Sequence, residues 1–372
     1  MKQFTSLLIV FLFFTSCTEE GAQKKKSNSP SSERIMTSGV YIGNSKLQYT
    51  GKAGELVIVC DNTIFTDEIF VALDSVFGDY IKPYYPPEKR FTLLQMNQDR
   101  YNKIGKRVRN LMRLEINNKI EKGDPQVIVK KDFYARTQIL TEILAHDNED
   151  LLLAADHLLS DLANIYDQQE WNREYIRHKE ENNIIVRRNL SKQFGITLDM
   201  PRQGKYESIK SSFARISFPD RSRQMDIQAD GGFSSAKANF IQSGIMIWSF
   251  DYKDSSQLAP AYLMKARDTI LKYNALHEIE GVYMGTQDHP AVIPVHNRLK
   301  IGDVEGYEFR GLYKFTGRFE PSGGKFWSFQ FKHPTRNKII AISAYLDAPP
   351  TMSSSMDIRR LQAILYSLKI TE

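Results

Sequence analysis

Few side chains in this sequence have the types and spacing that covalent chemistry needs. Cys60 is the last residue of a continuous apolar run at 55–60, which is typical of a strand buried on both faces, and Asp61 follows it. In open α/β sheets, ligands bind at the carboxyl ends of such strands, so Asp61 is a candidate ligand contact. A thiol nucleophile also needs a base, and no histidine lies near Cys60 in the sequence. We expect a buried, inert cysteine, with a hydrolase that uses Cys60 and Asp61 as the alternative.

Two histidines in the second half are candidates for a catalytic loop. His289 and His296 flank a proline-containing segment, with Asp288 beside the first histidine. A metal site needs three or four converging ligands, and this spacing matches no zinc signature, so we expect no metal. The same loop remains an alternative location for hydrolase chemistry.

Three charged residues in the second half are candidates for binding an anionic ligand. Arg267, its neighbour Asp268, and Arg310 are candidates for the lining of a polar cleft, because the guanidinium fork matches carboxylates and phosphates. The alternative is that Arg267 and Asp268 form a structural ion pair between a helix and a sheet.

The wider sequence contains no recognisable catalytic motif. It lacks a Gly-rich phosphate loop, Gly-x-Ser-x-Gly, His-Glu-x-x-His and Cys-x-x-Cys. We therefore expect no cofactor and favour a protein without enzymatic activity. The formal net charge is +6 over 372 residues, and it is spread along the chain. This predicts a solvated surface and no nucleic-acid partner, even at the densest basic segment, 100–109.

Cys17 is a candidate for a different reaction, acylation of its thiol. The segment before it has a short basic start, an apolar stretch at 4–14 and the small residues Thr15 and Ser16, which is the arrangement of a secretory signal peptide. Its end resembles a bacterial lipobox, although Phe14 replaces the usual leucine. We predict a signal peptide at 1–16 and an outer-membrane lipoprotein held by three acyl chains, either periplasmic or surface-exposed.

The residues after Cys17 predict a tether and two folded units. Residues 17–50 are polar and Ser-rich, which is typical of a flexible tether. An N-terminal α/β-type unit is expected at 51–193, with strands at 55–60, 91–96, 110–116 and 126–130, and with helices at 67–77 and 136–146. A long helix at 151–178 is amphipathic in its first half, which favours packing across the sheet over a projecting partner-binding arm. Charges at 170–174 predict an exposed second half.

The second unit, 194–372, is expected to be an antiparallel sheet flanked by helices. Short β runs at 213–218, 244–252, 306–316, 325–332 and 338–346 are separated by Gly, Pro and Asn. Helical spacing of apolar residues marks 260–273 and 356–368. The chain as a whole is therefore predicted to be an α+β protein.

Several strings in this order resemble a known family. They are Cys60-Asp61-Asn62, Phe194-Gly195-Ile196-Thr197-Leu198, Lys265-Ala266-Arg267-Asp268, Arg310-Gly311-Leu312-Tyr313, Tyr345-Leu346-Asp347-Ala348-Pro349 and 363–370. With the lipobox, they resemble the domain-of-unknown-function 4837 family of Gram-negative envelope lipoproteins, over about 51–370. The second unit is also similar to the PsbP-like fold. The resemblance implies an envelope location and no established activity, so it assigns no catalytic residue.

These observations lead to two hypotheses about function. The first is a non-enzymatic binding or accessory module that docks an envelope protein or a glycan and attaches to the membrane through its N-terminal lipid. The alternative is an envelope hydrolase that uses Cys60 with Asp61, or the loop of His289 and His296.

Overall fold

The structure is a computed structural model that describes residues 39–371, except 224–238, 318–322, 351 and the side chains of 155–158, 222–223 and 239. These residues all belong to the compact unit Ile35–Glu372. The predicted signal peptide and Cys17 lie outside the described residues. The first strand begins at Gly39, so the end of the predicted tether is part of the fold.

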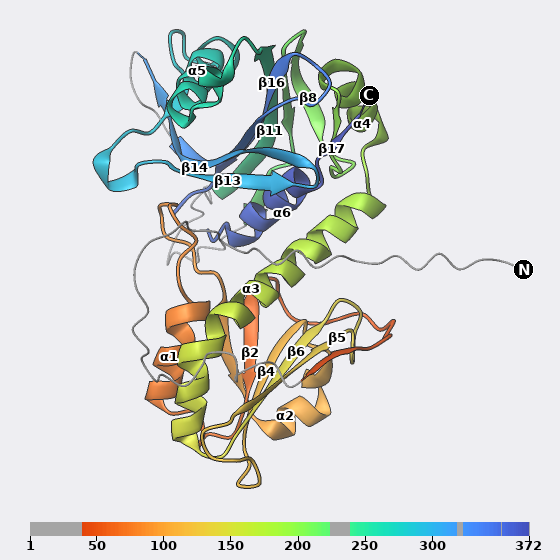
Figure 1. The fold of residues 1–372 in the computed structure, drawn as a ribbon, viewed down its shortest axis with the longest axis vertical. Helices are drawn as coiled ribbons and strands as arrows, with labels where there is room; N and C mark the ends of the chain where they lie inside the picture. The colour runs from red at the N-terminus through yellow and green to blue at the C-terminus, as the bar shows by residue number, and fades with distance from the viewer. Residues whose placement is uncertain (1–38, 224–238, 318–322, 351, 372) are drawn as a thin grey trace, which may run out of the picture. The chain divides into compact units, whose positions relative to one another are not determined.

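A mixed, mainly parallel sheet forms the first half of the described chain (Figure 1). Its strand order is β1-β5-β6-β4-β2-β3. The strands are β1 (Gly39–Ile42), β2 (Glu55–Val59), β3 (Thr92–Met96), β4 (Asn110–Ile116), β5 (Gln126–Lys131) and β6 (Ile139–Ala145). From β3 to β6 all neighbours are parallel, whereas β5 is antiparallel to β6 and β1 is parallel to β5.

Helices cover both faces of this sheet. Helix α1 (Asp67–Phe77) begins where the Thr66 hydroxyl accepts a hydrogen bond from the amide of Ile69, and it ends at Gly78, as predicted. Its buried face packs with the long helix α3 against one face of the sheet. The opposite face is covered by α2 (Gln98–Lys103) and the 3₁₀ turn η1 (Gly105–Arg107), which bury Tyr101 against β2 and β4. Burial on both sides explains the continuous apolar run of β2.

The helix predicted at 136–146 is wrong, because Ile139–Ala145 forms strand β6. This strand lies between β4 and β5, and all of its residues except Leu144 are buried. A strand buried on both faces has no alternation of apolar and polar residues. The spacing of Ile139, Leu140, Ile143 and Leu144 therefore imitated one face of a helix.

Helix α3 (Asn148–Glu180) runs unbroken for 33 residues, or about 50 Å at 1.5 Å per residue. Its first half packs on the first sheet, as predicted, through residues that include Leu151, Leu162 and Tyr166. Within the described part of the chain, no helix combines the length and apolar character needed to cross a membrane.

An antiparallel sheet forms the second half of the described chain, as predicted, with nine strands where the sequence indicated five. Its main path is β12-β14-β15-β16-β11-β9-β8, with β10 paired to β11 and β13 paired to β14. The strands are β8 (Lys205–Lys210), β9 (Phe213–Ser217), β10 (Arg221–Arg223), β11 (Asn239–Asp251), β12 (Tyr283–Thr286), β13 (Val295–Ile301), β14 (Val304–Thr316), β15 (Gly323–Lys332) and β16 (Lys338–Asp347).

The second sheet separates two apolar cores. On one face, Trp327, Phe329 and Phe331 of β15 pack against α4 (Ile184–Phe194) and α6 (Ser355–Tyr366). On the other face, Phe326 packs beneath α5 (Pro260–Asn274), with the 3₁₀ turn η2 (Ser255–Leu258) before it. A short pair of strands, β7 (Ile196–Thr197) and β17 (Lys369–Ile370), brings the described end of the chain beside α4. Together with the first sheet, this establishes the α+β class.

Two phenylalanines on α1 test the orientation of this helix. Phe77 is 0% exposed and its ring lies edge-on to those of Phe91 and Tyr166, whereas Phe70 is 38% exposed. We expect Phe77→Ala to lower the free energy of unfolding by about 3–5 kcal/mol, because it leaves a cavity in the core. Phe70→Ala is the matched control, with an expected loss below about 1 kcal/mol. Denaturant unfolding measures both, and equal losses would contradict the orientation of α1.

Candidate functional site

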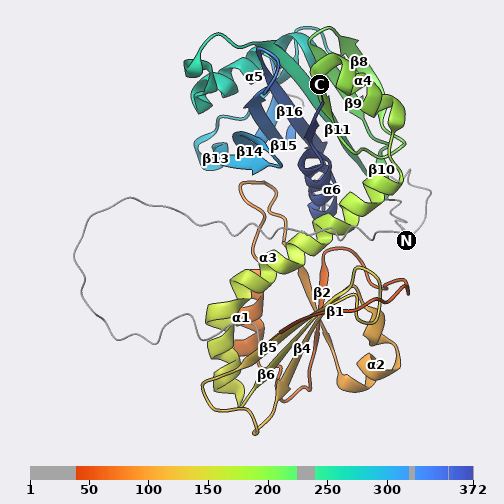
Figure 2. The ribbon, with the colours of Figure 1, turned by 45° about the vertical axis from the view of Figure 1, so that its right-hand side comes forward.

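The second half of α3 packs along α6 (Figure 2). Trp171 Nε1 donates a hydrogen bond to Gln362 Oε1 at 2.8 Å, and its ring centroid lies 5.5 Å from that of Tyr366. The prediction of an exposed second half is therefore wrong. Glu170 and Arg173, expected on the surface, are 0% and 5% exposed.

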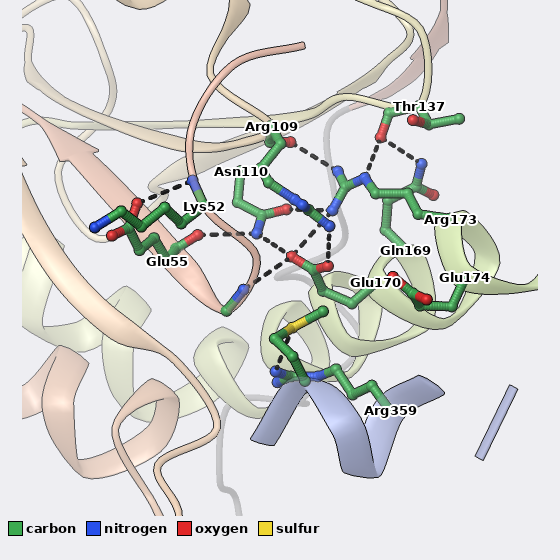
Figure 3. Close-up of polar contacts among 12 residues, drawn as sticks. Lys52, Glu55, Arg109, Asn110, Thr137, Gln169, Glu170, Arg173, Glu174 and Arg359 are labelled. Carbon is green, nitrogen blue, oxygen red and sulfur yellow. Dashed lines mark hydrogen bonds and ion pairs between the residues drawn. The ribbon is translucent and has the colours of Figure 1, made fainter. Parts of the chain in front are cut away.

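Glu170 is the centre of a buried polar cluster (Figure 3). Its Oε1 accepts hydrogen bonds from Asn110 Nδ2 at 2.6 Å and from the Gly54 amide at 3.4 Å, and it lies 3.1 Å from Arg173 Nη1. The other carboxylate oxygen accepts from Arg109. Burial alone would raise the pKa of Glu170, but the positive charges of Arg173 and Arg109 lower it overall.

Arg173 extends the cluster to the backbone of the first sheet. It donates to the carbonyl oxygens of Arg109 and Thr137, both at 2.8 Å, and to Asn110 Oδ1 at 2.9 Å. These partners lie at the amino ends of the parallel strands β4 and β6, opposite to the ends where α/β sheets bind ligands. We interpret the cluster as a structural clamp that fixes α3 to the sheet. Arg109, expected within a solvated basic surface, is one of its buried members.

Asp167 joins the two sheets through two arginines. Arg90 Nε donates to Asp167 Oδ2 at 2.7 Å, and Arg359 Nη2, from α6, donates to Asp167 Oδ1 at 2.7 Å. The Arg359 side chain is 1% exposed and lies over the Phe91 ring, 4.6 Å from its centroid. One carboxylate on α3 therefore holds a guanidinium from each half of the molecule.

The loop 79–90 makes a second connection between the sheets. Tyr84 lies in the core of the second sheet, where its hydroxyl donates to the carbonyl oxygen of Phe326 at 3.3 Å. Glu88 pairs with Lys325 of β15 at 2.8 Å and accepts from the Ser354 hydroxyl at 2.6 Å. Burial raises the pKa of Glu88, but the hydrogen bonds from Lys325 and Ser354 lower it overall.

These connections leave a pocket of about 470 Å³ at the junction. Its wall comes from the loop 79–90, α3, β14 and α6, and includes Lys82, Arg90, Gln168, Trp171, Arg310 and Gln362. Pockets of this volume hold small-molecule ligands in other proteins. The pocket brings together cationic, amide and aromatic side chains from segments far apart in the sequence.

Arg310 is the predicted ligand-binding residue that the structure places in this pocket. Its Nε and Nη2 donate to Glu308 Oε1 at 2.9 and 2.7 Å, and Glu308 also accepts from Trp327 Nε1. The guanidinium lies 5.6 Å from the centroid of the Trp327 ring, and its side chain is 22% exposed. The Glu308 carboxylate behind it and the aromatic ring beside it fix its position.

Arg267 and Asp268 lie elsewhere, between α5 and β12. Arg267 is 0% exposed, lies 3.9 Å from the centroid of the Phe326 ring, and donates to Asp268 Oδ1 at 3.0 Å and to Thr286 Oγ1 at 2.7 Å. These contacts match the alternative interpretation, a structural ion pair between a helix and the sheet.

Cys60 has the environment of an inert thiol. It is 3% exposed, and burial, with a smaller contribution from the charge of Asp61, raises its pKa to about 11. Asp61 is exposed, and its carbonyl oxygen accepts from the amide of Ile64 at 3.0 Å in the turn after β2. Both residues lie at the end of the first sheet's strand β2 and outside the junction pocket.

The two histidines of the second half do not form a site together. His289 Nδ1 accepts from the amide of Ala291 at 3.2 Å and caps the 3₁₀ turn η3 (Pro290–Val292). His296 is exposed on β13, with its ring centroid 6.0 Å from that of Phe309. Among the described residues, no group of three or more His, Cys, Asp or Glu side chains is arranged to hold a metal ion.

Comparison with family models divides the chain in two. Residues 183–367 match the model of a domain of unknown function, DUF4837. This part of the chain belongs to the DUF4837 family. Residues 50–179 match a second domain of unknown function, DUF8532, so the DUF4837 match covers less of the chain than the expected 51–370. The DUF4837 match begins next to α4, whereas the sequence placed the start of the second unit at 194.

Comparisons with solved structures add little. The Ran-binding protein Mog1p of Saccharomyces cerevisiae is 12% identical, with a TM-score of 0.28 over 48% of this chain and 91% of that protein. LpqN of Mycobacterium tuberculosis, described as involved in cell envelope biogenesis, is 14% identical, with a TM-score of 0.25 over 48% of this chain and 83% of LpqN. Such scores support no argument, and the PsbP-like fold is not confirmed. A search of curated protein sequences found no match.

Most residues of the pocket wall were not predicted from the sequence. Asn164, Gln168 and Trp171 are spaced by four and three residues on α3, which places them on one helix face. That polar stripe was a usable signal, because it lies beside the buried apolar stripe. Nothing local indicated Arg90 or Arg359, because their shared partner Asp167 is distant in sequence.

The ion pair of Glu88 and Lys325 gives a stability prediction. Both side chains are nearly buried, so Glu88→Gln leaves an unpaired buried ammonium group. We expect a loss of about 3–5 kcal/mol in the free energy of unfolding at pH 7. Glu121→Gln, at an exposed position, is the matched control and should be nearly neutral.

The same pair predicts a pH dependence. Because the pKa of Glu88 is lower in the folded state, its contribution is complete above the unfolded value of about 4.3 and is lost as the pH falls through the folded pKa. The difference between wild type and Glu88→Gln should therefore shrink below about pH 4 in denaturant unfolding. A difference that is constant from pH 7 to pH 3 would contradict the pairing.

Proposed function

We propose that this protein is a lipid-anchored, non-enzymatic binding module of the cell envelope that holds a saccharide in the junction pocket. The observation that carries the proposal is the composition of the pocket wall, where a tryptophan lies beside three amide side chains and several cations. Saccharides present hydroxyl groups at their edges and C–H groups on their faces. Amides and guanidinium groups can bind the hydroxyl groups, and an aromatic ring can pack against the C–H face.

Free hydrogen-bonding groups in the pocket support a polar ligand. Gln362 uses its carbonyl oxygen to accept from Trp171, and its amide nitrogen has no partner among the described residues. The exposed side chain of Gln168 likewise has no partner in the described structure. A ligand with several hydroxyl groups can satisfy these donors and acceptors at once.

The acids of the pocket support binding without catalysis. Asp167 is held by Arg90 and Arg359, and the nearby Glu308 by Arg310 and Trp327. A further acid of the pocket wall, Asp79, lies 3.9 Å from Lys82. Glycoside hydrolysis needs one carboxyl group that can donate a proton and a second that acts as a base or nucleophile. Each of these carboxylates is instead engaged by a cationic side chain in an ion pair. The alternative hydrolase is also disfavoured, because the Cys60 thiol is buried and the histidines lie apart from it.

Attachment to the membrane rests on the sequence around Cys17 and gives a direct test. We expect cells fed a labelled palmitate analogue to incorporate it into the wild-type protein and to leave Cys17→Ser unlabelled. The wild type should then fractionate with the outer membrane, whereas the variant should lose both signals. Cys60→Ser is the control and should stay labelled, because its thiol is buried in the fold. Equal labelling of wild type and Cys17→Ser would contradict the anchor.

Saccharide binding in the pocket can be tested by calorimetric titration of the full-length protein in detergent. The panel should contain neutral and acidic monosaccharides and short oligosaccharides. We expect Trp171→Ala and Gln168→Ala each to weaken binding by about tenfold or more, because each removes a pocket contact. Tyr273→Ala, an exposed aromatic residue on α5, is the control and should bind normally.

Two outcomes would overturn this function. The first is that no member of the panel binds, or that both pocket variants bind as tightly as the wild type. The second is release of cleaved products from an oligosaccharide, with cleavage abolished by substitution of a pocket residue.

A further inference from the structure

The junction pocket contains one more cation than its acids neutralise. Arg310 is paired with Glu308, and Lys82 lies 3.9 Å from Asp79. Asp167 is a single carboxylate shared by Arg90 and Arg359. Among the described pocket residues and their ion-pair partners, this leaves a net excess of one positive charge beside α3.

Arg90 lies where its positive charge can pair with a ligand in the pocket. Its Nε donates to Asp167 Oδ2 and its Nη2 donates to Asn164 Oδ1 at 3.0 Å, but Nη1 has no hydrogen-bond partner in the described structure. The Arg90 side chain is 21% exposed and lines the pocket. Its two existing bonds fix the guanidinium plane, so little rotamer entropy is lost when a ligand binds.

Lys82 provides a second cation on the same wall. Its side chain is 79% exposed, and the separation of 3.9 Å from the 45% exposed Asp79 is at the limit of an ion pair. Exposed pairs of this kind contribute little, so the ammonium group can turn to a better partner. Gln168, which also lines the pocket, adds an unpartnered amide donor.

We propose that the ligand of this pocket is a uronic-acid-type saccharide, whose carboxylate binds Arg90 and Lys82 while its ring packs near Trp171. The proposal rests on the proposed saccharide-binding function and names the class of sugar. A carboxylate carries one negative charge, which balances the excess. A phosphate ester carries about 1.5–2 charges at neutral pH and would leave the pocket negatively charged.

The test compares glucuronate with its methyl ester, with glucose and with glucose 6-phosphate, by calorimetric titration of the full-length protein in detergent. The methyl ester keeps the ring and removes only the charge. We expect glucuronate to bind about tenfold more tightly than the ester and glucose, and more tightly than the phosphate. This preference should shrink as salt is raised, because the charges are partly exposed.

Variants assign the effect to the pocket. Lys82→Gln and Arg90→Gln should each reduce the preference for glucuronate over the ester, measured as the ratio of the two dissociation constants. Arg90 also holds Asp167, so thermal unfolding must first show that Arg90→Gln is folded. If this variant is not folded, the test rests on Lys82→Gln, which changes an exposed side chain. Arg100→Gln, an exposed arginine on α2 outside the pocket, is the control.

The outcomes separate the two proposals. If glucose and the ester bind as tightly as glucuronate, the uronic-acid assignment fails and the saccharide function stands. If the phosphate binds most tightly, the assignment also fails. If no sugar binds, both fail. If glucuronate binds as expected, comparison of galacturonate with trigalacturonate distinguishes the source, because tighter binding of the trimer indicates a polymer and equal binding indicates a free sugar acid.

Discussion

Two carboxylates three residues apart on α3, Asp167 and Glu170, hold the arginines that join this molecule together. Glu170 binds Arg109 and Arg173 within the first half, and Asp167 binds Arg90 and, across the junction, Arg359. A buried charge is tolerated only when its hydrogen bonds are satisfied, because desolvation costs several kcal/mol per ion. The helix must therefore stay regular through this turn, so that both carboxylates keep facing their arginines. This pairing explains why α3 runs without a break from the first sheet to α6.

The pocket follows from the same helical geometry. Once Asp167 and Glu170 face the arginines, Asn164, Gln168 and Trp171 lie on the neighbouring face of α3. The loop 79–90 and α6 are held against that face by Glu88, Tyr84 and Arg359. The polar wall is therefore a consequence of how the two sheets are joined.

The sequence predicted the elements whose pattern is local. The caps of α1, helices α5 and α6, and strands β9, β11, β14, β15 and β16 follow from turn residues and apolar spacing within a dozen positions. Strands β8, β10, β12 and β13 were not predicted. Strand β6 was misassigned as a helix because a strand buried on both faces lacks the alternation of apolar and polar residues. The second half of α3 was correctly predicted as helix but wrongly as exposed, because charges at helical spacing look the same whether water or an arginine faces them. Arg310 was identified by its chemistry, but Arg267 shows that the same chemistry can be interior.

The two family matches meet at the short segment between α3 and α4. The first match ends at 179, at the last turn of α3, and the second begins at 183, next to α4. Only Glu181–Asn183 separate the two helices, so the chain itself does little to orient one sheet against the other. Orientation must come from side chains, and many of those at the junction form paired charges and hydrogen bonds, beside the apolar contacts of Tyr84 and of Trp171 with Tyr366. Directional polar contacts lose their energy over small displacements, whereas apolar contacts tolerate sliding. A joint built in this way holds the walls of the pocket in one arrangement, as selective binding of a small polar ligand requires.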